Sequence, residues 1–219
     1  WNAVEMVKDA FDKFAQIHDK VNFSYFSADK NVAYGTDYND KLVGSGNADY
    51  MLGHAGNDKI DGGNGDDDID GGAGNDVLGG GGGNDVIKGD AGNDNISGAN
   101  GDDSLSGGDG TDALAGGNGN DLLDGGKGND ALSGGGGNDL MIDTSGTNSF
   151  SGGVGADSMR GGAGNDKMSG SAGKDVLYGA GGTDTYTGGT DADVFVFNAK
   201  DATTITITDF NRMDSLANL

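Results

Sequence analysis

The sequence predicts an all-β solenoid in which very short strands alternate with tight turns. Two observations predict this fold class. Residues 35–196 form 18 consecutive repeats of nine residues, and no insertion or deletion interrupts the frame. Each repeat joins a segment rich in Gly and Asp to one large apolar residue, so each can supply one turn and one strand.

The composition excludes an ordinary globular core and several classes of partner. Of 219 residues, 47 are Gly, 36 are acidic and only 33% are hydrophobic. Every acidic residue except Glu5 is Asp, the carboxylate typical of turns and of oxygen-ligand sites for hard cations. The net charge of −23 disfavours nucleic acid and anionic membranes. Without Cys, neither disulfides nor thiolate zinc sites can stabilise the fold.

The first six positions of each repeat are expected to form the turn, and the last three a very short strand. The first position is Gly in all repeats but one, which has Asp143, and the fourth is Gly in most. Because Gly adopts positive φ at little cost, we expect glycines at the first and fourth positions to allow a tight turn.

The eighth position is always large and apolar or aromatic, which predicts the core. In a strand, alternate side chains face opposite sides, so this residue points inward while the seventh and ninth point outward. The core residues expected from this pattern are Leu42, Met51, Ile60, Ile69, Leu78, Ile87, Ile96, Leu105, Leu114, Leu123, Leu132, Met141, Phe150, Met159, Met168, Leu177, Tyr186 and Phe195.

The sixth position supplies the candidate metal ligands. It is Asp in every repeat except the one with Asn148. The candidates are Asp40, Asp49, Asp58, Asp67, Asp76, Asp85, Asp94, Asp103, Asp112, Asp121, Asp130, Asp139, Asp157, Asp166, Asp175, Asp184 and Asp193.

The repeat resembles the GGxGxDxUx nonapeptide of the RTX (repeats-in-toxin) family. Residues 71–79 (GGAGNDVLG) and 161–169 (GGAGNDKMS) are typical, and the resemblance covers about three quarters of the chain. It implies a right-handed parallel β-roll of about nine coils, with two repeats per coil, and Ca²⁺ between the turns.

Stacked turns explain why the cation is expected. The Asp residues of successive coils lie 18 apart in sequence and about 4.8 Å apart in space, so the column is repulsive unless a cation separates them. Ca²⁺ binds six to eight oxygens, which carboxylates and turn carbonyls can supply. Two columns with eight gaps each predict up to about sixteen Ca²⁺ ions. We expect the weakest occupancy beside Asn148, in the column that also contains Asp130 and Asp166.

The small core also predicts that folding depends on the metal. One buried side chain per nine residues buries little apolar area against about 1 to 2 kcal/mol of backbone entropy per residue. We therefore expect the metal-free chain to be disordered and Ca²⁺ to fold it.

Other interpretations of these residues are weaker. A disordered Gly/Asp spacer would not keep a strict period. An EF-hand beginning at Asp66 would need Glu where Val77 stands. Enzyme motifs are missing, and the only histidines are His18 and His54, the latter expected to face solvent in a turn. An ice-binding face would need rows of Thr at the seventh and ninth positions, and only Thr185 and Thr187 match such rows.

The repeats divide the chain into three segments. Residues 1–34 are expected to form an amphipathic helix followed by a strand over 21–26, as a cap. The alternative is a remnant of an upstream domain that resembles the opening of a matrixin-type protease. Residues 35–196 form the roll. Residues 197–219 are expected to form capping strands and resemble the ends of RTX proteins, where a type I secretion signal lies.

The outward positions of even-numbered repeats are apolar toward the C-terminus, as at Leu122, Leu140 and Val176. We expect the C-terminal segment, another subunit or a further domain to cover this face. The resemblance implies a secreted, extracellular or cell-surface bacterial protein that folds on Ca²⁺ and acts as a structural, surface or secretion element without enzymatic activity. The alternatives are an accessory domain of a secreted protease, lipase or alginate epimerase, and a self-assembling matrix or surface-layer protein.

Overall fold

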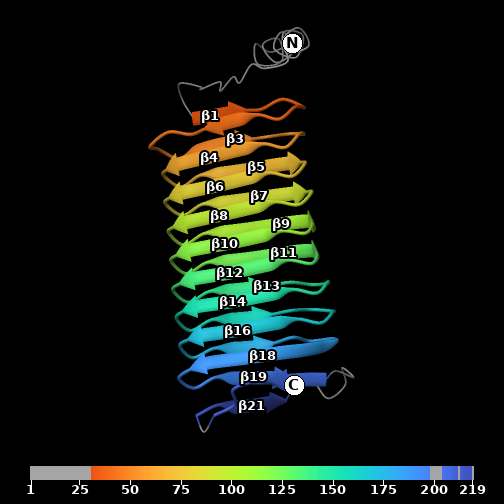
Figure 1. Cartoon of the computed structure of the whole chain (residues 1–219). Coiled ribbons are helices and arrows are strands. Elements are labelled where there is room, and N and C mark those ends of the chain that lie inside the picture. Colours follow the sequence, from red (N-terminus) through yellow and green to blue (C-terminus); the bar gives the residue numbers. More distant parts are fainter. Residues whose placement is uncertain (1–30, 198–203, 212, 219) are drawn as a thin grey trace.

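The computed structural model describes residues 31–197, 204–211 and 213–218, which form a parallel β-roll (Figure 1). Eleven strands make one sheet: β1 (Asn31–Tyr34), β3 (Asp49–Leu52), β5 (Asp68–Ala73), β7 (Val86–Ala91), β9 (Ser104–Gly110), β11 (Leu122–Gly128), β13 (Leu140–Ile142), β15 (Ser158–Arg160), β17 (Val176–Tyr178), β19 (Val194–Phe197) and β21 (Ser215–Asn218). Ten make the other: β2 (Lys41–Val43), β4 (Lys59–Asn64), β6 (Val77–Gly82), β8 (Asn95–Asn100), β10 (Ala113–Asn118), β12 (Ala131–Gly136), β14 (Ser149–Val154), β16 (Lys167–Ala172), β18 (Thr183–Thr190) and β20 (Thr204–Ile207). The all-β roll predicted from the repeat is therefore confirmed.

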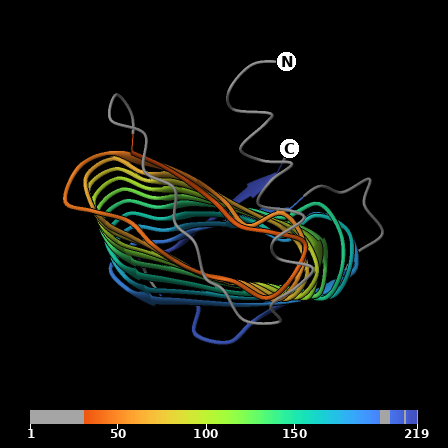
Figure 2. The ribbon, with the colours of Figure 1, turned by 90° about the horizontal axis from the view of Figure 1, so that it is seen from above.

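Consecutive strands alternate between the sheets, so one coil takes two repeats. Leu114 of β10 pairs with Leu132 of β12, 18 residues later, and Leu132 pairs with Phe150 of β14. Seen along the axis, the coils stack in register as a flattened ring with two long sides (Figure 2). Because the register never slips, residues at one position of the repeat form straight columns.

The roll extends past the 18 repeats at both ends. Before them, β1 pairs with β3, and after them β20 and β21 continue the two sheets. The last coil is longer, because Phe195 pairs with Leu216, 21 residues later. Phe210 lies against Phe195 there, with ring centroids 6.0 Å apart. The helix and strand expected within residues 1–30 lie outside the described residues.

The eighth-position residues form the core, as predicted. All of them are buried, with exposed fractions of 0–2%, and they make one continuous cluster between the sheets. In most strands the residues on either side face outward, as the alternating exposed, buried, exposed pattern of β2 illustrates, whereas Val196 of β19 is buried. The core is thus one side chain wide in each strand.

The prediction for the glycines is correct at the fourth position and wrong at the first. Positive φ occurs at the fourth position, as at Gly74 (146°), and at the second, where even His54 adopts 79°. The first-position glycines do not have positive φ. They are required because a Cβ at Gly53 would lie only 2.4 Å from Oδ2 of Asp58 and from the carbonyl oxygen of Gly71. His54 is exposed in its turn, as expected.

The outer face of the eleven-stranded sheet presents Leu122 and Leu140, each 41% exposed, and Val176. The described C-terminal residues do not cover this face, because β20 and β21 add strands at the end of the sheets. Within the described ranges the elements are all strands, and no helix there is long and apolar enough to cross a membrane.

Candidate metal sites

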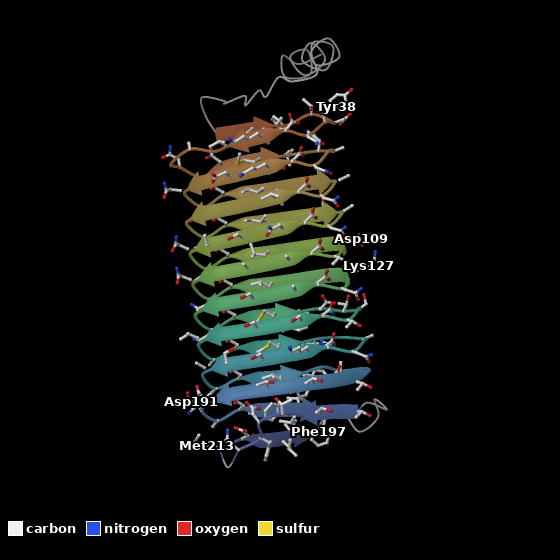
Figure 3. The ribbon with its side chains drawn as sticks, viewed as in Figure 1. Tyr38, Asp109, Lys127, Asp191, Phe197 and Met213 are labelled. Carbon is white, nitrogen blue, oxygen red and sulfur yellow. The ribbon has the colours of Figure 1, made fainter. Side chains whose placement is uncertain are left out.

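The turns form two columns, one along each edge of the roll. The odd column contains Asp40, Asp58, Asp76, Asp94, Asp112, Asp130, Asn148, Asp166 and Asp184. The even column contains Asp49, Asp67, Asp85, Asp103, Asp121, Asp139, Asp157, Asp175 and Asp193. Figure 3 shows Tyr38, Asp109 and Lys127 from odd-column turns at one edge and Asp191 from an even-column turn at the other. The structure therefore stacks the predicted ligands as the repeat implies.

In the sixth-position Asp residues from Asp58 to Asp193, one carboxylate oxygen belongs to a hydrogen-bond ladder. Oδ1 of Asp58 accepts a hydrogen bond from the backbone N–H of Asp40 at 2.8 Å, and Oδ1 of Asp76 accepts one from Asp58 at 2.7 Å. A second, exposed ladder runs in the opposite direction at the fifth position, where Asn57 donates its N–H to Oδ1 of Asn39 at 2.8 Å. Many neighbouring turns are thus connected twice, so the turns are held in register by side chains as well as by strands.

The other carboxylate oxygen has no hydrogen-bond partner. Buried, unpartnered Oδ2 atoms occur in the sixth-position Asp residues from Asp58 to Asp193. Each lies beside the first-position glycine of its own turn, and in many turns the carbonyl oxygen of the next coil's first residue lies there too. At Gly107, for example, an added Cβ would lie 2.4 Å from Oδ2 of Asp112 and 2.6 Å from the carbonyl oxygen of Gly125. Carboxylate and carbonyl oxygens therefore converge at the gap between two turns.

This arrangement is costly without a counter-charge. Burial raises the pKa of Asp58 and Asp166 to about 7 and that of Asp94 to about 6, although the ladder N–H groups lower it. The described sixth-position carboxylates make no ion pair with Lys or Arg. Desolvating an unpaired carboxylate costs on the order of several kcal/mol. Something other than a basic side chain must therefore neutralise the columns.

The donor set fits a hard, oxygen-binding cation. Ca²⁺ takes carboxylate and backbone carbonyl oxygens together, and both are present at the gaps. The described residues contain no group of three or more His, Cys, Asp or Glu side chains suited to a metal. Zinc sites use several side chains, whereas these gaps combine carboxylates with main-chain carbonyls.

The first two turns differ from the others. Oδ2 of Asp40 accepts hydrogen bonds from the N–H and hydroxyl of Thr36, at 2.6 and 2.9 Å. Oδ2 of Asp49 accepts one from the N–H of Ser45 at 2.6 Å, and its Oδ1 is the unpartnered atom. Their carboxylates already have donors, so the N-terminal end of the roll has less need of a cation.

Three acidic residues outside the predicted set also act at the turns. Asp214 continues the even column, since its Oδ1 accepts a hydrogen bond from the N–H of Asp193 at 3.2 Å. Asp209 accepts hydrogen bonds from the N–H groups of Gly188 and Gly189, at 2.9 and 2.7 Å. Both fall outside the nine-residue frame, so their spacing gave no signal.

Asp143 is the third, and it supplies an acidic group to the one repeat that lacks Asp at its sixth position. Asp143 is buried, and its Oδ2 is unpartnered. Burial and the adjacent Asp130 carboxyl raise its pKa to about 7. A signal was present in the sequence, because the one repeat without Asp at its sixth position is the one with Asp at its first.

Two parallel sheets joined by stacked carboxylate-bearing turns define the class of calcium-dependent β-rolls. The model of the RTX calcium-binding nonapeptide repeat matches residues 27–59, 44–78, 79–114, 106–141, 142–177 and 166–195. The chain belongs to this family, and its repeats are calcium-binding repeats. A comparison with curated proteins found no significant match.

Proposed function

We propose that this chain is a secreted, non-enzymatic module that folds when Ca²⁺ binds and then serves as a rigid structural element. The ligands are the Oδ2 atoms of the sixth-position Asp residues from Asp58 to Asp193, together with first-position carbonyl oxygens of the adjacent turn. The supporting observation is the repeated convergence of these oxygens, buried and without a protein donor, at successive gaps. Up to about sixteen ions would occupy the two columns.

Coupling between metal binding and folding follows from the charges. Without Ca²⁺, the roll would bury rows of carboxylates that repel one another, while the one-residue-wide core contributes little. With Ca²⁺, the same rows become ligands. Extracellular calcium modules work at about 10⁻⁴ to 10⁻³ M, so a chain of this kind stays unfolded in a cytosol poor in Ca²⁺ and folds after export.

The test is a Ca²⁺ titration of the full chain after chelation, followed by far-UV circular dichroism. We expect a disordered spectrum in chelator and a cooperative change to a β spectrum at millimolar Ca²⁺. Mg²⁺ at the same concentration is the control, because it demands near-octahedral geometry and keeps its water. A spectrum unaffected by Ca²⁺ would refute the proposal.

A second candidate function is self-association into a matrix or surface layer. It is favoured by the exposed Leu122, Leu140 and Val176 on the outer face of the eleven-stranded sheet. Light scattering on the titrated sample distinguishes it: Ca²⁺- and concentration-dependent growth in mass supports assembly. A constant monomer mass supports a single module or an accessory domain of a secreted enzyme.

A further inference from the structure

The turn over residues 143–148 departs from the repeat at two positions. Asp143 replaces the first Gly, and Asn148 replaces the sixth Asp. Both side chains are buried, with exposed fractions of 1% and 2%. The two changes act on different gaps of the odd column: the gap before this turn, toward residues 125–130, and the gap after it, toward residues 161–166.

Asn148 maintains the ladder but removes the anionic oxygen from the gap after the turn. Its Oδ1 accepts a hydrogen bond from the N–H of Asp130 at 2.8 Å, as an Asp would. Its Nδ2 donates to the carbonyl oxygens of Ser145 and Gly161, both at 3.4 Å. The carbonyl of Gly161 is the first-position carbonyl that, in a regular gap, faces a carboxylate oxygen. An amide donor therefore satisfies the acceptor that a cation would otherwise bind.

Asp143 adds a carboxylate to the gap before the turn. A Cβ at Gly125 would lie 2.1 Å from Oδ2 of Asp143 and 3.0 Å from Oδ2 of Asp130. In the preceding gap the corresponding neighbour of Gly107 is the carbonyl oxygen of Gly125. The carbonyl of Asp143 instead points toward the following coil, where it lies 2.7 Å from the position of a Cβ on Gly162.

The Asp143 carboxylate is held in place for this role. Its Oδ1 accepts a hydrogen bond from the N–H of Ser145 at 2.9 Å, which fixes the side chain and leaves Oδ2 directed at Asp130. Both Oδ2 atoms are buried and have no donor. Two carboxylates with nothing between them repel, so the geometry calls for a cation or a proton.

We propose that Asp143 and Asp130 together bind one Ca²⁺ in the gap between residues 125–130 and 143–148, and that the next gap, sealed by the amide of Asn148, binds none. The irregular repeat has therefore moved its carboxylate by one gap and has not lost it. This inference rests on the proposed calcium function. A site with two carboxylates also attracts Ca²⁺ more strongly than a site with one, because affinity rises with the charge of the ligands.

Counting bound ions by native mass spectrometry of the full chain tests the inference. Asp143→Asn keeps the acceptor for Ser145 but turns an amide toward Asp130, so we expect one Ca²⁺ fewer than in the parent. Asp143→Gly restores the regular carbonyl, so the count should return to the parental value. Asn148→Asp supplies a carboxylate to the sealed gap and should add one ion. The control is Asp124→Asn, which removes an exposed charge nearby and should leave the count unchanged.

Two outcomes separate this inference from the proposed function. If the parent binds no Ca²⁺, the proposed function fails and the inference fails with it. If the parent binds Ca²⁺ but Asp143→Asn binds the same number, only the role of Asp143 is overturned, and the pair shares a proton. If Asn148→Asp binds the same number of Ca²⁺ ions as the parent, the proposal that the amide of Asn148 keeps Ca²⁺ out of the next gap is wrong.

Discussion

The backbone N–H of Asp76 donates a hydrogen bond to Oδ1 of Asp94, one coil further along, at 2.8 Å. Oδ2 of the same Asp94 carboxylate is buried without a partner. One side chain thus has two separable roles: Oδ1 connects the coils, and Oδ2 is the proposed metal ligand. Substitutions that remove one role or both can therefore show what each carboxylate oxygen contributes.

Asp94→Asn should lose one Ca²⁺ but keep the connection between coils, as Asn148 does naturally. Asp94→Ala should lose both, because the N–H of Asp76 then has no acceptor. An unsatisfied buried N–H costs about 1 to 3 kcal/mol, so Asp94→Ala should be less stable than Asp94→Asn by about that amount. Thermal unfolding in saturating Ca²⁺ measures the difference. Equal stability of the two variants would contradict the separate role of Oδ1.

Gly53→Ala should destabilise the roll strongly. The added Cβ would lie 2.4 Å from both Oδ2 of Asp58 and the carbonyl oxygen of Gly71, so the turn or the carboxylate must move. We expect a loss of at least about 1 to 3 kcal/mol, the usual cost of overpacking, together with weaker Ca²⁺ binding. Denaturant unfolding at fixed Ca²⁺ and a Ca²⁺ titration measure the two effects.

The matched control for this substitution is Gly46→Ala. Gly46 also lies in a turn, but it does not have positive φ, and a Cβ there would have no heavy atom within 4 Å. The free energy of unfolding of the Gly46→Ala variant should stay within about 0.5 kcal/mol of that of the parent. If both variants lost the same stability, the explanation would be a general intolerance of these turns to side chains.

Much of the fold follows from the repeat itself. The nine-residue period places the core at one position, and Leu105 and Leu123 are buried as that period requires. The sixth-position Asp residues stack because a constant coil length leaves no other register. A uniform period is therefore sufficient to predict sheets, core and columns.

The remaining features depend on contacts that a period does not encode. The role of the glycine at position 53 comes from the carboxylate of Asp58 and a carbonyl one coil away, not from its own φ. Asp214 joins the even column only because the last coil has three extra residues. Asp143 acts in the gap before its own turn. Each of these required the positions of atoms in neighbouring coils.

Leu105→Ala should lower the free energy of unfolding by about 2 to 5 kcal/mol, as large-to-small substitutions in a close-packed core do. Leu105 is 1% exposed, and the core offers no second layer to fill the space. Leu122→Ala is the control, because Leu122 is 41% exposed on the outer face one coil later. It should change the stability of the monomer by less than about 0.5 kcal/mol. A Leu122→Ala variant as unstable as Leu105→Ala would mean that this outer face is covered in solution.

Acid should partly replace Ca²⁺ in the metal-free chain. Burial raises the pKa of Asp58 and Asp166 from 3.8 to about 7 and that of Asp85 and Asp103 to about 6. A carboxyl whose folded pKa is raised binds its proton more tightly in the folded state, so protonation favours folding. This contribution is fully present below the unfolded value of about 4 and is lost as the pH rises through 6 to 7.

Circular dichroism in chelator across this range measures the effect. We expect more β structure at about pH 4 than at pH 8, with a midpoint between about 5 and 7. The midpoint is informative, because it lies above about 4, the value of an Asp side chain in an unfolded chain. In saturating Ca²⁺ the trend should reverse, since protons compete with the metal for the same oxygens. Metal-free samples that are equally disordered at both pH values, or more ordered at pH 8, would contradict the raised pKa values of the columns.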